Sequence, residues 1–569
     1  MRLFVFKWEG EIKDRHMKKQ KVIFVVGGVM SGVGKGVTTA SIAKLIQDRG
    51  YAVTALKIDP YINVDAGTMN PTEHGEVFVL DDGDETDQDM GNYERYLDVD
   101  LSRINYMTTG RVYQSVIERE RNLEYKGKCV EVVPHIPLEI IGRIDAAIAH
   151  ASADVAVVEI GGTVGEYQNI LFLEAARMMR RRPDTDVAFV LVSYLPVPDK
   201  IGEMKTKPTQ TAARILNSTG IQADFVVARA ERALDQKRKE KIAMFCDVAE
   251  EDVISAPDVD SIYAVPEMFE QQGFTDRMLA HLGLKQGVRT QRAAQWDEMV
   301  TRLRAAQASG IRPKIGIAGK YFATGDYVLT DSYISVIEAI KHAGTAHGVN
   351  PEIVWLDSEV YETDAARMHE ELSALDGLIV PGGFGSRGIE GKIAAITHCR
   401  EHKLPFLGIC YGMQMLVTEF ARSVAGLEDA HTTEINPDTP HPVVDILPEQ
   451  KEKLAHKEYG GSMRLGAYPA RVVAGSMTQE LYGGADEISE RHRHRYEVNP
   501  AYVQRLTDAG LVFGATSPDG TLMEVAELSR DVHPYFIGAQ FHPEFRSRPL
   551  RPHPLFSGLV AAAYVHSTQ

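Results

Sequence analysis

Short runs of consecutive apolar residues alternate along the chain with longer stretches in which apolar residues recur every three or four positions. The early runs cover residues 21–28, 52–59, 154–160, 186–192 and 224–228. A continuous apolar run is typical of a strand that is covered on both faces, as in a parallel sheet. Strands that alternate with helical stretches predict an α/β fold with a doubly wound, mostly parallel sheet.

The same alternation starts again in the second half of the chain. Apolar runs at residues 314–319, 376–381, 404–410 and 535–541 predict a second doubly wound, mostly parallel α/β sheet. Residues 286–308, between the halves, are polar and charged with four large apolar side chains at helical spacing, which predicts an amphipathic linker helix. We therefore divide the chain into an N-terminal extension (1–20), a first domain (21–285), a linker helix (286–312) and a second domain (313–569).

Composition narrows the functional classes. The chain has 569 residues, of which 44% are hydrophobic and 25% charged, as is ordinary for a globular protein with several domain equivalents. The 62 Lys and Arg residues against 79 Asp and Glu residues give a net charge of −17, so we expect no nucleic-acid partner. Any phosphate must then be bound by local groups, such as backbone N–H groups and a few lysines.

Four cysteines, Cys129, Cys246, Cys399 and Cys410, form no C-x-x-C pair. Their number and spacing exclude a disulfide framework and a zinc ribbon, and fit a reduced cytoplasmic setting. No apolar run reaches the roughly 18–20 residues that a membrane span needs, and the first twenty residues lack the pattern of a signal peptide. We expect a cytoplasmic protein with no membrane partner.

A glycine-rich loop, GGVMSGVGKG at residues 27–36, follows the first predicted strand. Glycines let backbone N–H groups turn inward, the next helix adds its N-terminal partial charge, and Lys35 can reach the terminal phosphates. The loop departs from the standard phosphate-loop pattern, because five residues rather than four separate Gly28 from Gly34 and Gly36 replaces the usual Ser or Thr. A purely structural turn is the alternative, but the strand–loop–helix context favours nucleotide binding.

Because Gly36 has no hydroxyl, acidic side chains elsewhere must hold a magnesium ion. The candidates are the acidic run at residues 81–89 and Glu159, which ends a strand where doubly wound sheets bind ligands. A solvated loop is the plainer explanation of the acidic run taken alone. The string KTKPTQ at residues 205–210 combines two lysines with hydroxyls and suits a triphosphate, although alone it is typical of a surface loop.

Several strings together resemble the CTP synthase family: GGVMSGVGKG (27–36), KIDPYINVD (57–65), HGEVF (74–78), EIGGTVG (159–165) and KTKPTQ (205–210). The resemblance runs from about residue 21 to the C-terminal region and implies a phosphate-loop-type synthetase, or amidoligase, domain. It implies that ATP is bound by Gly32, Val33, Gly34, Lys35, Gly36, Val37 and Asp89, and magnesium by Asp89 and Glu159. It further implies that UTP or CTP is bound by Ser31, Glu166, Tyr167, Gln168, Lys205, Thr206, Lys207, Pro208, Thr209, Gln210 and Lys241.

One segment departs from the family. Residues 165–168 read GEYQ, where the family commonly reads GDIE in the segment that holds the pyrimidine nucleotide. The missing carboxylate at Gln168 leaves open how strongly the product CTP inhibits, but not the fold or the chemistry.

The second half carries a thiol motif, GICYG at residues 408–412, directly after a predicted strand. This is the form of a nucleophile elbow, in which glycines permit the tight turn and a helix N-terminus favours the thiolate of Cys410. After another strand, QFHPE supplies His542 as a base and Glu544 to orient its imidazole. Backbone N–H groups of the segment at 381–385 and of Tyr411 would stabilise an oxyanion. The other three cysteines are interpreted as small core residues.

This second set resembles the class I glutamine amidotransferases, which implies a flavodoxin-like domain and a Cys410–His542–Glu544 glutaminase. The resemblance implies that glutamine is bound by Gly383, Tyr411, Gly412, Met413, Gln414, Glu434 and Arg495. It also puts Arg387 in a lid segment that is associated with GTP activation.

The expected function is ATP-dependent amination of UTP to CTP, a step of pyrimidine biosynthesis, with ammonia from glutamine and a 4-phosphorylated UTP intermediate. The resemblance also implies Mg²⁺, GTP as an allosteric activator, and a homotetramer. Two alternatives stay open: an amidoligase with a carboxylate substrate, which a substrate screen without UTP turnover would support, and a nucleotide-regulated scaffold or filament protein without catalysis, which glutaminase turnover would exclude.

Overall fold

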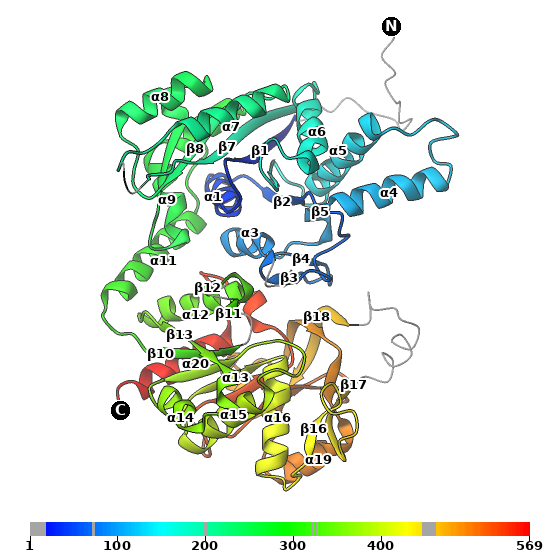
Figure 1. Ribbon diagram of the computed structural model, residues 1–569, viewed down its shortest axis with the longest axis vertical. Helices are drawn as coiled ribbons and strands as arrows, with labels where there is room; N and C mark the ends of the chain where they lie inside the picture. The colour runs from blue at the N-terminus through cyan, green and yellow to red at the C-terminus, as the bar shows by residue number, and fades with distance from the viewer. Residues whose placement is uncertain are drawn as a thin grey trace.

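The computed structural model describes residues 19–70, 74–198, 200, 202–319, 323–324, 327–328, 330–446 and 463–569. The predicted N-terminal extension lies outside the described residues as far as residue 18. Figure 1 shows two α/β bodies, one above the other, with helix α11 (Gln291–Ala308) running along one side from the upper body toward the lower one. The α/β class predicted from the alternation of apolar runs and helical stretches is confirmed.

The sheet of the first domain is parallel throughout, and β1 lies at its centre between β6 and β7. Strand β1 is an unbroken apolar run because helices cover it on both sides, and its residues from Lys21 to Gly28 are all buried. In spatial order the strands are β5 (Tyr106–Thr108), β2 (Val53–Asp59), β6 (Val155–Ile160), β1 (Gln20–Gly28), β7 (Thr185–Tyr194), β8 (Phe225–Ala230) and β9 (Val253–Pro257).

Two hydrophobic clusters, one on each face of this sheet, form the core of the first domain. One face is covered by α4 (Thr109–Arg121), α5 (Val132–His150), α6 (Ile170–Arg180), α7 (Lys207–Ser218) and α8 (Gln236–Cys246). The other is covered by α1 (Lys35–Asp48), α3 (Asp89–Leu97), α9 (Val265–Gln271), α10 (Phe274–His281) and the linker helix α11. A small hairpin, β3 (Val77–Val79) and β4 (Glu85–Asp87), precedes α3.

The main sheet of the second domain has nine strands, of which five are parallel as expected and four extend the sheet in antiparallel order. The sequence pattern did not reveal the antiparallel part, because strands such as β19 consist mostly of polar and charged residues and contain no apolar run. In spatial order the strands are β13 (Glu352–Asp357), β10 (Lys314–Gly319), β14 (Gly377–Val380), β15 (Phe406–Ile409), β23 (Phe536–Ala539), β22 (Met523–Glu527), β21 (Val512–Thr516), β18 (Arg464–Val472) and β19 (Glu487–His494).

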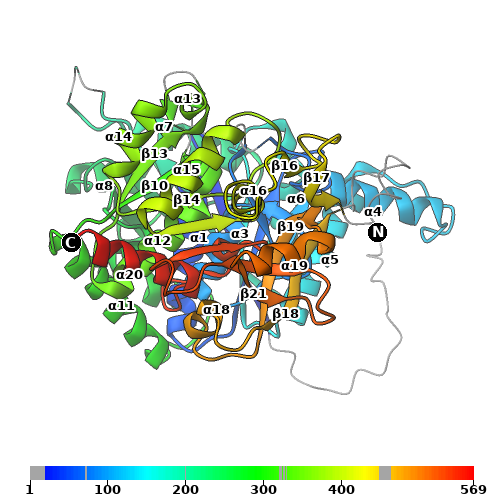
Figure 2. The ribbon, with the colours of Figure 1, turned by 90° about the horizontal axis from the view of Figure 1, so that it is seen from below.

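Helices cover both faces of the second sheet as well, and Figure 2 shows α15 and α16 on one side with α20 on the other. The first face carries α13 (Ser358–Tyr361), α14 (Ala365–Ser373), α15 (Ile389–His402), α16 (Tyr411–Ser423) and α19 (Pro500–Asp508). The second carries α12 (Ile334–His347), α18 (Met477–Leu481) and α20 (Pro554–His566). Beside them, β16 (Ala430–Thr432), β17 (His441–Ile446) and β20 (Tyr496–Val498) form a small sheet, and β11 (Ala323–Thr324) pairs with β12 (Tyr327–Val328). No helix among the described residues is long and apolar enough to cross a bilayer.

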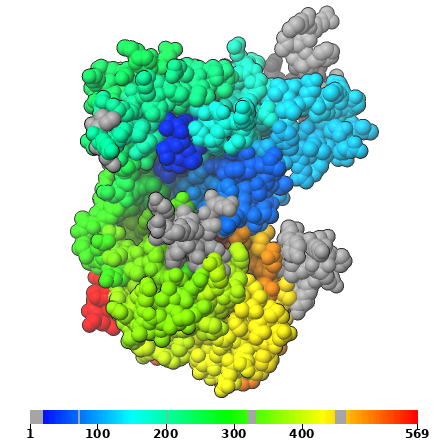
Figure 3. Space-filling view, viewed as in Figure 1, coloured from blue at the N-terminus to red at the C-terminus, as the bar shows by residue number. Residues whose placement is uncertain are grey.

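A buried ion cluster joins the two domains, which meet at a narrower waist in the space-filling view (Figure 3). Arg491 of β19 donates two hydrogen bonds to the carboxylate of Glu94 on α3, at 2.8 and 3.0 Å. Arg548 donates to the same carboxylate at 2.6 Å, and to Asp100 at 3.1 Å. The side chains of Glu94, Arg491 and Arg548 are essentially inaccessible to solvent. A charge that is removed from water needs partners of this kind, so the cluster restricts how the domains dock.

Replacing Glu94 should therefore be strongly destabilising. Glu94→Ala leaves two buried guanidinium groups without their main partner, and we expect a loss of about 3–5 kcal/mol in the free energy of unfolding. Urea unfolding followed by circular dichroism measures this loss. The matched control is Glu480→Ala, which removes an exposed ion pair with Arg530 and should cost at most about 1 kcal/mol. Equal stability losses in the two variants would contradict the role of the buried cluster.

Candidate active sites

The glycine-rich loop connects β1 to α1, as the sequence predicts, and its backbone is left-handed at several positions. The φ angles of Val29, Gly32 and Gly34 are 81°, 72° and 83°. Helix α1 begins at Lys35, and its N-cap residue Gly34 offers no side-chain hydrogen bond to the first turn. The N–H groups of that turn are thus available to an anion, in the field of the helix N-terminus.

Glycine at position 36 makes room for a carboxylate. A Cβ atom added to Gly36 would lie 1.8 Å from Oδ1 of Asp89, which is the first residue of α3. A side chain at position 36 can therefore be accommodated only if Asp89 moves. Asp89 thus takes the place beside the loop that a hydroxyl has in standard phosphate loops, and the sequence argument that Gly36 requires an acidic residue elsewhere has a structural basis.

Four carboxylates surround the buried amine of Lys57 at the carboxyl ends of the central strands. Lys57 forms a hydrogen bond with Asp89 and donates to Glu159 at 3.0 Å, while its Nζ lies 3.5 Å from Asp87 and 3.7 Å from Asp59. The hydroxyl of Tyr93 donates to Glu159. The structure thus brings the two predicted metal ligands together. Asp59 was missed by the sequence argument, although its position at the end of a predicted strand was a signal.

Electrostatics at this centre leave an excess of negative charge. Burial disfavours the charged amine, but Asp87, Asp89, Glu159 and Asp59 outweigh it and raise the pKa of Lys57 well above its usual value. Burial raises the pKa of Asp59 to about 6 and that of Asp87 to about 7, against the lowering effect of Lys57. Oδ2 of Asp59 is buried and accepts no hydrogen bond from the described residues. Hard oxygen ligands with an unsatisfied atom fit a divalent cation such as Mg²⁺.

A pocket of about 180 Å³ lies next to the loop, between α1 and the ends of β8 and β9. Gly34, Val37 and Thr38 line it from the loop side. Residues that the sequence argument missed complete it: Arg229, Ala256, Asp258, Val259, Ile262, Val265, Met268 and Phe269. An apolar wall with an ion pair between Arg229 and Asp258 at its edge suits a flat heterocycle.

The predicted pyrimidine-nucleotide residues lie on several elements. Lys205 and Thr206 precede α7, where Thr206, Thr209 and Gln210 are buried and Gln210 donates to Thr206 at 3.1 Å. Lys205 forms an exposed ion pair with Glu203. Other predicted residues face solvent: Ser31, Tyr167, Gln168, Lys207 and Lys241. The side chain of Gln168 donates to Glu166, and α8, which carries Lys241, packs against α7.

In the second domain, Cys410 sits in a strained turn between β15 and α16. Its φ and ψ angles are 51° and −98°, which is unusual for a residue with a side chain. A Cβ atom at Gly408 would lie 2.7 Å from the backbone of Gly412, and one at Gly412 would lie 2.0 Å from the carbonyl oxygen of Val380. Both glycines are therefore required, and the turn presents the sulfur at the N-terminus of α16.

His542 and Glu544 form the base that the sequence predicts. Nδ1 of His542 lies 2.7 Å from Oε1 of Glu544, while Nε2 makes no hydrogen bond with the described residues. Burial favours the neutral imidazole, but the Glu544 carboxylate and then Cys410 outweigh it and raise the pKa of His542 to about 10. The charged imidazolium form of His542 is therefore favoured at neutral pH.

The thiol opens into a pocket of about 340 Å³. Predicted glutamine-binding residues line it together with the triad: Gly383, Tyr411, Gln414, Glu434 and Arg495. Gly412 and Met413 are not among the lining residues, and the side chain of Met413 lies in the core. Arg387 is exposed and pairs with Glu359 at 3.3 Å. From the first domain, Gly67, Glu76 and Val77 also line the pocket, which the sequence argument did not foresee.

Comparisons with known proteins identify the family of this chain. The model of the CTP synthase N-terminus matches residues 21–284, and that of class-I glutamine amidotransferase matches residues 328–562. A CTP synthase from Methanopyrus kandleri is 51% identical over 95% of this chain and 99% of its own length. The chain belongs to the CTP synthase family.

Two further proteins are similar to this chain. A CTP synthase from Pyrococcus abyssi is also 51% identical, over 95% of this chain and 98% of its own. A solved structure of the glutaminase domain of Trypanosoma brucei CTPS, with bound acivicin, is 36% identical and covers 44% of this chain and 93% of its own, with a TM-score of 0.41. In this member of the CTP synthase family, both halves are present in one chain and contribute to one pocket.

The space at Gly36 can be tested by restoring a hydroxyl. In Gly36→Ser the new side chain must displace Asp89, and a misplacement of about 1 Å at a reacting centre can cost about 100-fold in rate. We expect ATP-dependent product formation to fall by about that factor, while glutamine hydrolysis without nucleotides stays within about twofold. Steady-state assays of both reactions measure this. Gly142→Ala, whose Cβ atom meets nothing within 4 Å, is the control; an unimpaired Gly36→Ser enzyme would refute the steric argument.

The pKa of His542 provides a second test. In Glu544→Gln the carboxylate that stabilises the imidazolium is lost, so the pKa of His542 falls from about 10. The imidazolium of His542 exists only below that pKa, so the alkaline limit of glutaminase kcat/KM should move to lower pH, with a loss of about 10²–10⁴-fold at the optimum. A pH profile of glutamine hydrolysis measures both effects. The exposed Glu428→Gln serves as the control, and an unshifted alkaline limit would contradict the assignment.

Proposed function

We propose that this chain catalyses the ATP-dependent amination of UTP to CTP, with glutamine as the nitrogen donor, in pyrimidine biosynthesis in the cytoplasm. Membership of the CTP synthase family supports the overall reaction. The observation that carries the proposal is the thiol pocket, because Gly67, Glu76 and Val77 of the phosphate-binding domain form part of its wall. Ammonia released at Cys410 is therefore released into a pocket that the first domain helps to form.

The first half-reaction takes place at Cys410. His542 holds the thiol proton, so that the thiolate attacks the carboxamide carbon of glutamine, and backbone N–H groups near Gly383 and Tyr411 stabilise the oxyanion. His542 then gives the proton to the departing ammonia, and water hydrolyses the glutamyl thioester to glutamate. Arg495 and Glu434, at the pocket wall, carry the charges that suit the α-carboxylate and α-amino groups of glutamine.

The second half-reaction takes place at the glycine-rich loop. ATP transfers its terminal phosphoryl group to O4 of the uracil ring, which converts a poor leaving group into phosphate. Lys35, which donates to the carbonyl oxygen of Gly162 at 3.0 Å, and Lys57 stabilise the charge of the transferring group. Ammonia then attacks C4 and phosphate leaves. The pocket beside Val37 suits the adenine ring, and the residues before and within α7 suit the UTP phosphates.

Asp89 and Glu159, supported by Asp59 and Asp87, would hold Mg²⁺ beside the phosphate loop. When bound, the ion would offset the negative charge of the phosphates and of the carboxylates around Lys57.

The proposal also includes regulation and assembly. GTP acts as an activator near Arg387, and the enzyme is a homotetramer. Large apolar side chains are exposed on the part of the first domain that carries α4, α5 and the segment after β6 (Figure 1), and such surfaces favour association. These side chains include Ile117, Leu123, Val132, Leu138 and Tyr167.

Replacing the nucleophile tests the division of labour. Cys410→Ala should abolish glutamine-dependent formation of CTP, while activity with added ammonia stays within about twofold, because the second half-reaction does not use the thiol. A coupled assay with UTP, ATP and Mg²⁺, with glutamine or an ammonium salt and with or without GTP, measures both activities.

Two outcomes would contradict the proposal. Loss of both activities in a folded Cys410→Ala enzyme would mean that the thiol serves more than glutamine hydrolysis. A native enzyme that hydrolyses glutamine and ATP without consuming UTP would indicate another amidoligase substrate. The control is Cys129→Ala, which removes an exposed thiol outside both sites and should change neither activity.

A further inference from the structure

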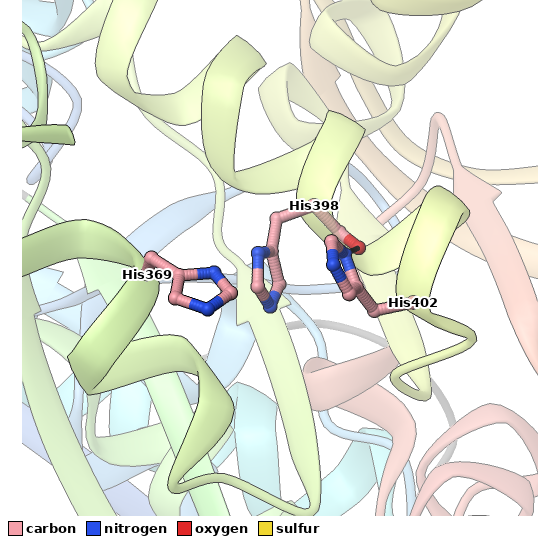
Figure 4. A group of neighbouring side chains, drawn as sticks. All are labelled: His369, His398 and His402. Carbon is pink, nitrogen blue, oxygen red and sulfur yellow. Dashed lines mark hydrogen bonds between the residues drawn. The ribbon is translucent and has the colours of Figure 1, made fainter. Parts of the chain in front are cut away.

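Three histidines gather on the second domain, away from both sites described above (Figure 4). His369 lies on α14, and His398 and His402 lie one helical turn apart near the end of α15. One ring nitrogen from each of the three lies within 4.8 Å of the other two. Because α15 begins at Ile389, beside the lid segment, the two histidines lie about 14–20 Å along the helix from that end.

The three rings form a row in Figure 4, with His398 in the middle. The rings of His398 and His402 stack at a centroid distance of 4.1 Å, and the ring of His369 meets that of His398 edge-on at 5.3 Å. Nδ1 of His402 lies 3.0 Å from the carbonyl oxygen of His398. A carbonyl oxygen only accepts, so Nδ1 carries the proton and Nε2 of His402 keeps its lone pair for a ligand bond.

The middle histidine, His398, is buried, whereas His369 and His402 are exposed, so an ion can reach the cluster from solvent. Imidazole is a common ligand of zinc-like ions.

We propose that His369, His398 and His402 bind a divalent transition-metal ion of the Zn²⁺ class, with water as the fourth ligand. Three imidazoles select zinc-like ions, whereas Mg²⁺ prefers the oxygen ligands around Lys57, so this site is chemically distinct from that of the phosphate loop. In a tetrahedral zinc site, nitrogens at 2.0–2.1 Å from the ion are about 3.3 Å apart. The stacked rings of His398 and His402 must therefore separate, and the three ring nitrogens must come closer together around the ion. Rotation of the exposed side chains of His369 and His402 allows this movement.

Such an ion would connect α14 to the end of α15. Helix α14 contributes only one fully buried side chain, Leu372, to the core, so it is weakly held compared with its neighbours. An ion bound by His369 and by the two histidines of α15 would fix α14 to α15 and so hold α14 in place. This inference does not depend on the proposed function, because the three histidines are not among the residues proposed for catalysis.

The test is a metal titration of the full-length chain in excess Mg²⁺, which keeps the carboxylate centre occupied. Calorimetry with Zn²⁺ should show one equivalent bound, and Co²⁺ should give visible bands of nitrogen and oxygen coordination without a thiolate charge-transfer band, which excludes Cys129 as a ligand. His369→Ala and His402→Ala should each weaken Zn²⁺ binding at least tenfold, whereas His150→Ala, an exposed histidine on α5, should not. Both substitutions are at exposed positions, and circular dichroism confirms that the variants fold.

Hydrogen exchange distinguishes a clamp from simple binding. Zn²⁺ should slow amide exchange in residues 365–373 of the native chain but not in His369→Ala. No binding by the native chain, or binding that both variants retain, overturns the metal site. Binding that depends on the histidines but leaves exchange in α14 unchanged overturns the proposed connection between the helices.

Discussion

The carboxylate of Glu94, held between the guanidinium groups of Arg491 and Arg548, determines how the two halves of the molecule meet. Three charges without access to water are stable only in the geometry that pairs them all. The same strand, β19, also carries Arg493, whose guanidinium pairs with Glu85 of the first domain at 2.8 Å and whose carbonyl oxygen lies 3.7 Å from the Cys410 sulfur. Docking of the domains and construction of the thiol pocket therefore depend on one strand.

The charges around Lys57 are not balanced in this way. Here Lys57, with Lys35 nearby, faces four carboxylates, so that negative charge remains in excess. Such an arrangement is unfavourable for stability and is retained where a site must accept cations or transfer charge. The contrast separates a structural cluster, which is complete in itself, from a functional one, which needs a ligand to complete it.

Much of the fold and of the candidate sites could be predicted from the sequence, because apolar runs reveal the strands and the candidate catalytic residues lie at the ends of those strands. Cys410, His542 and Glu159 each follow an apolar run, and parallel strands bring such positions to one edge of a sheet. What could not be predicted depends on contacts between distant segments. Asp89 meets Gly36 through the packing of α3 on α1. Arg491 is fully buried between the domains, although its neighbours in the sequence are polar and charged. The antiparallel strands of the second sheet were invisible for a different reason, since their alternation of polar and apolar residues is short and irregular.

Helix α3 connects these two centres. Its nine residues begin with Asp89 beside the phosphate loop and include Glu94 in the ion cluster between the domains, about 7.5 Å further along the axis. A helix this short moves as a rigid rod, so a shift at one end displaces the other. A bound nucleotide that displaces Asp89 would therefore also change the packing of Glu94 between the two halves, and such linkage is reciprocal. Tighter docking of the halves would then raise the affinity for ATP by the same factor by which ATP favours that docking.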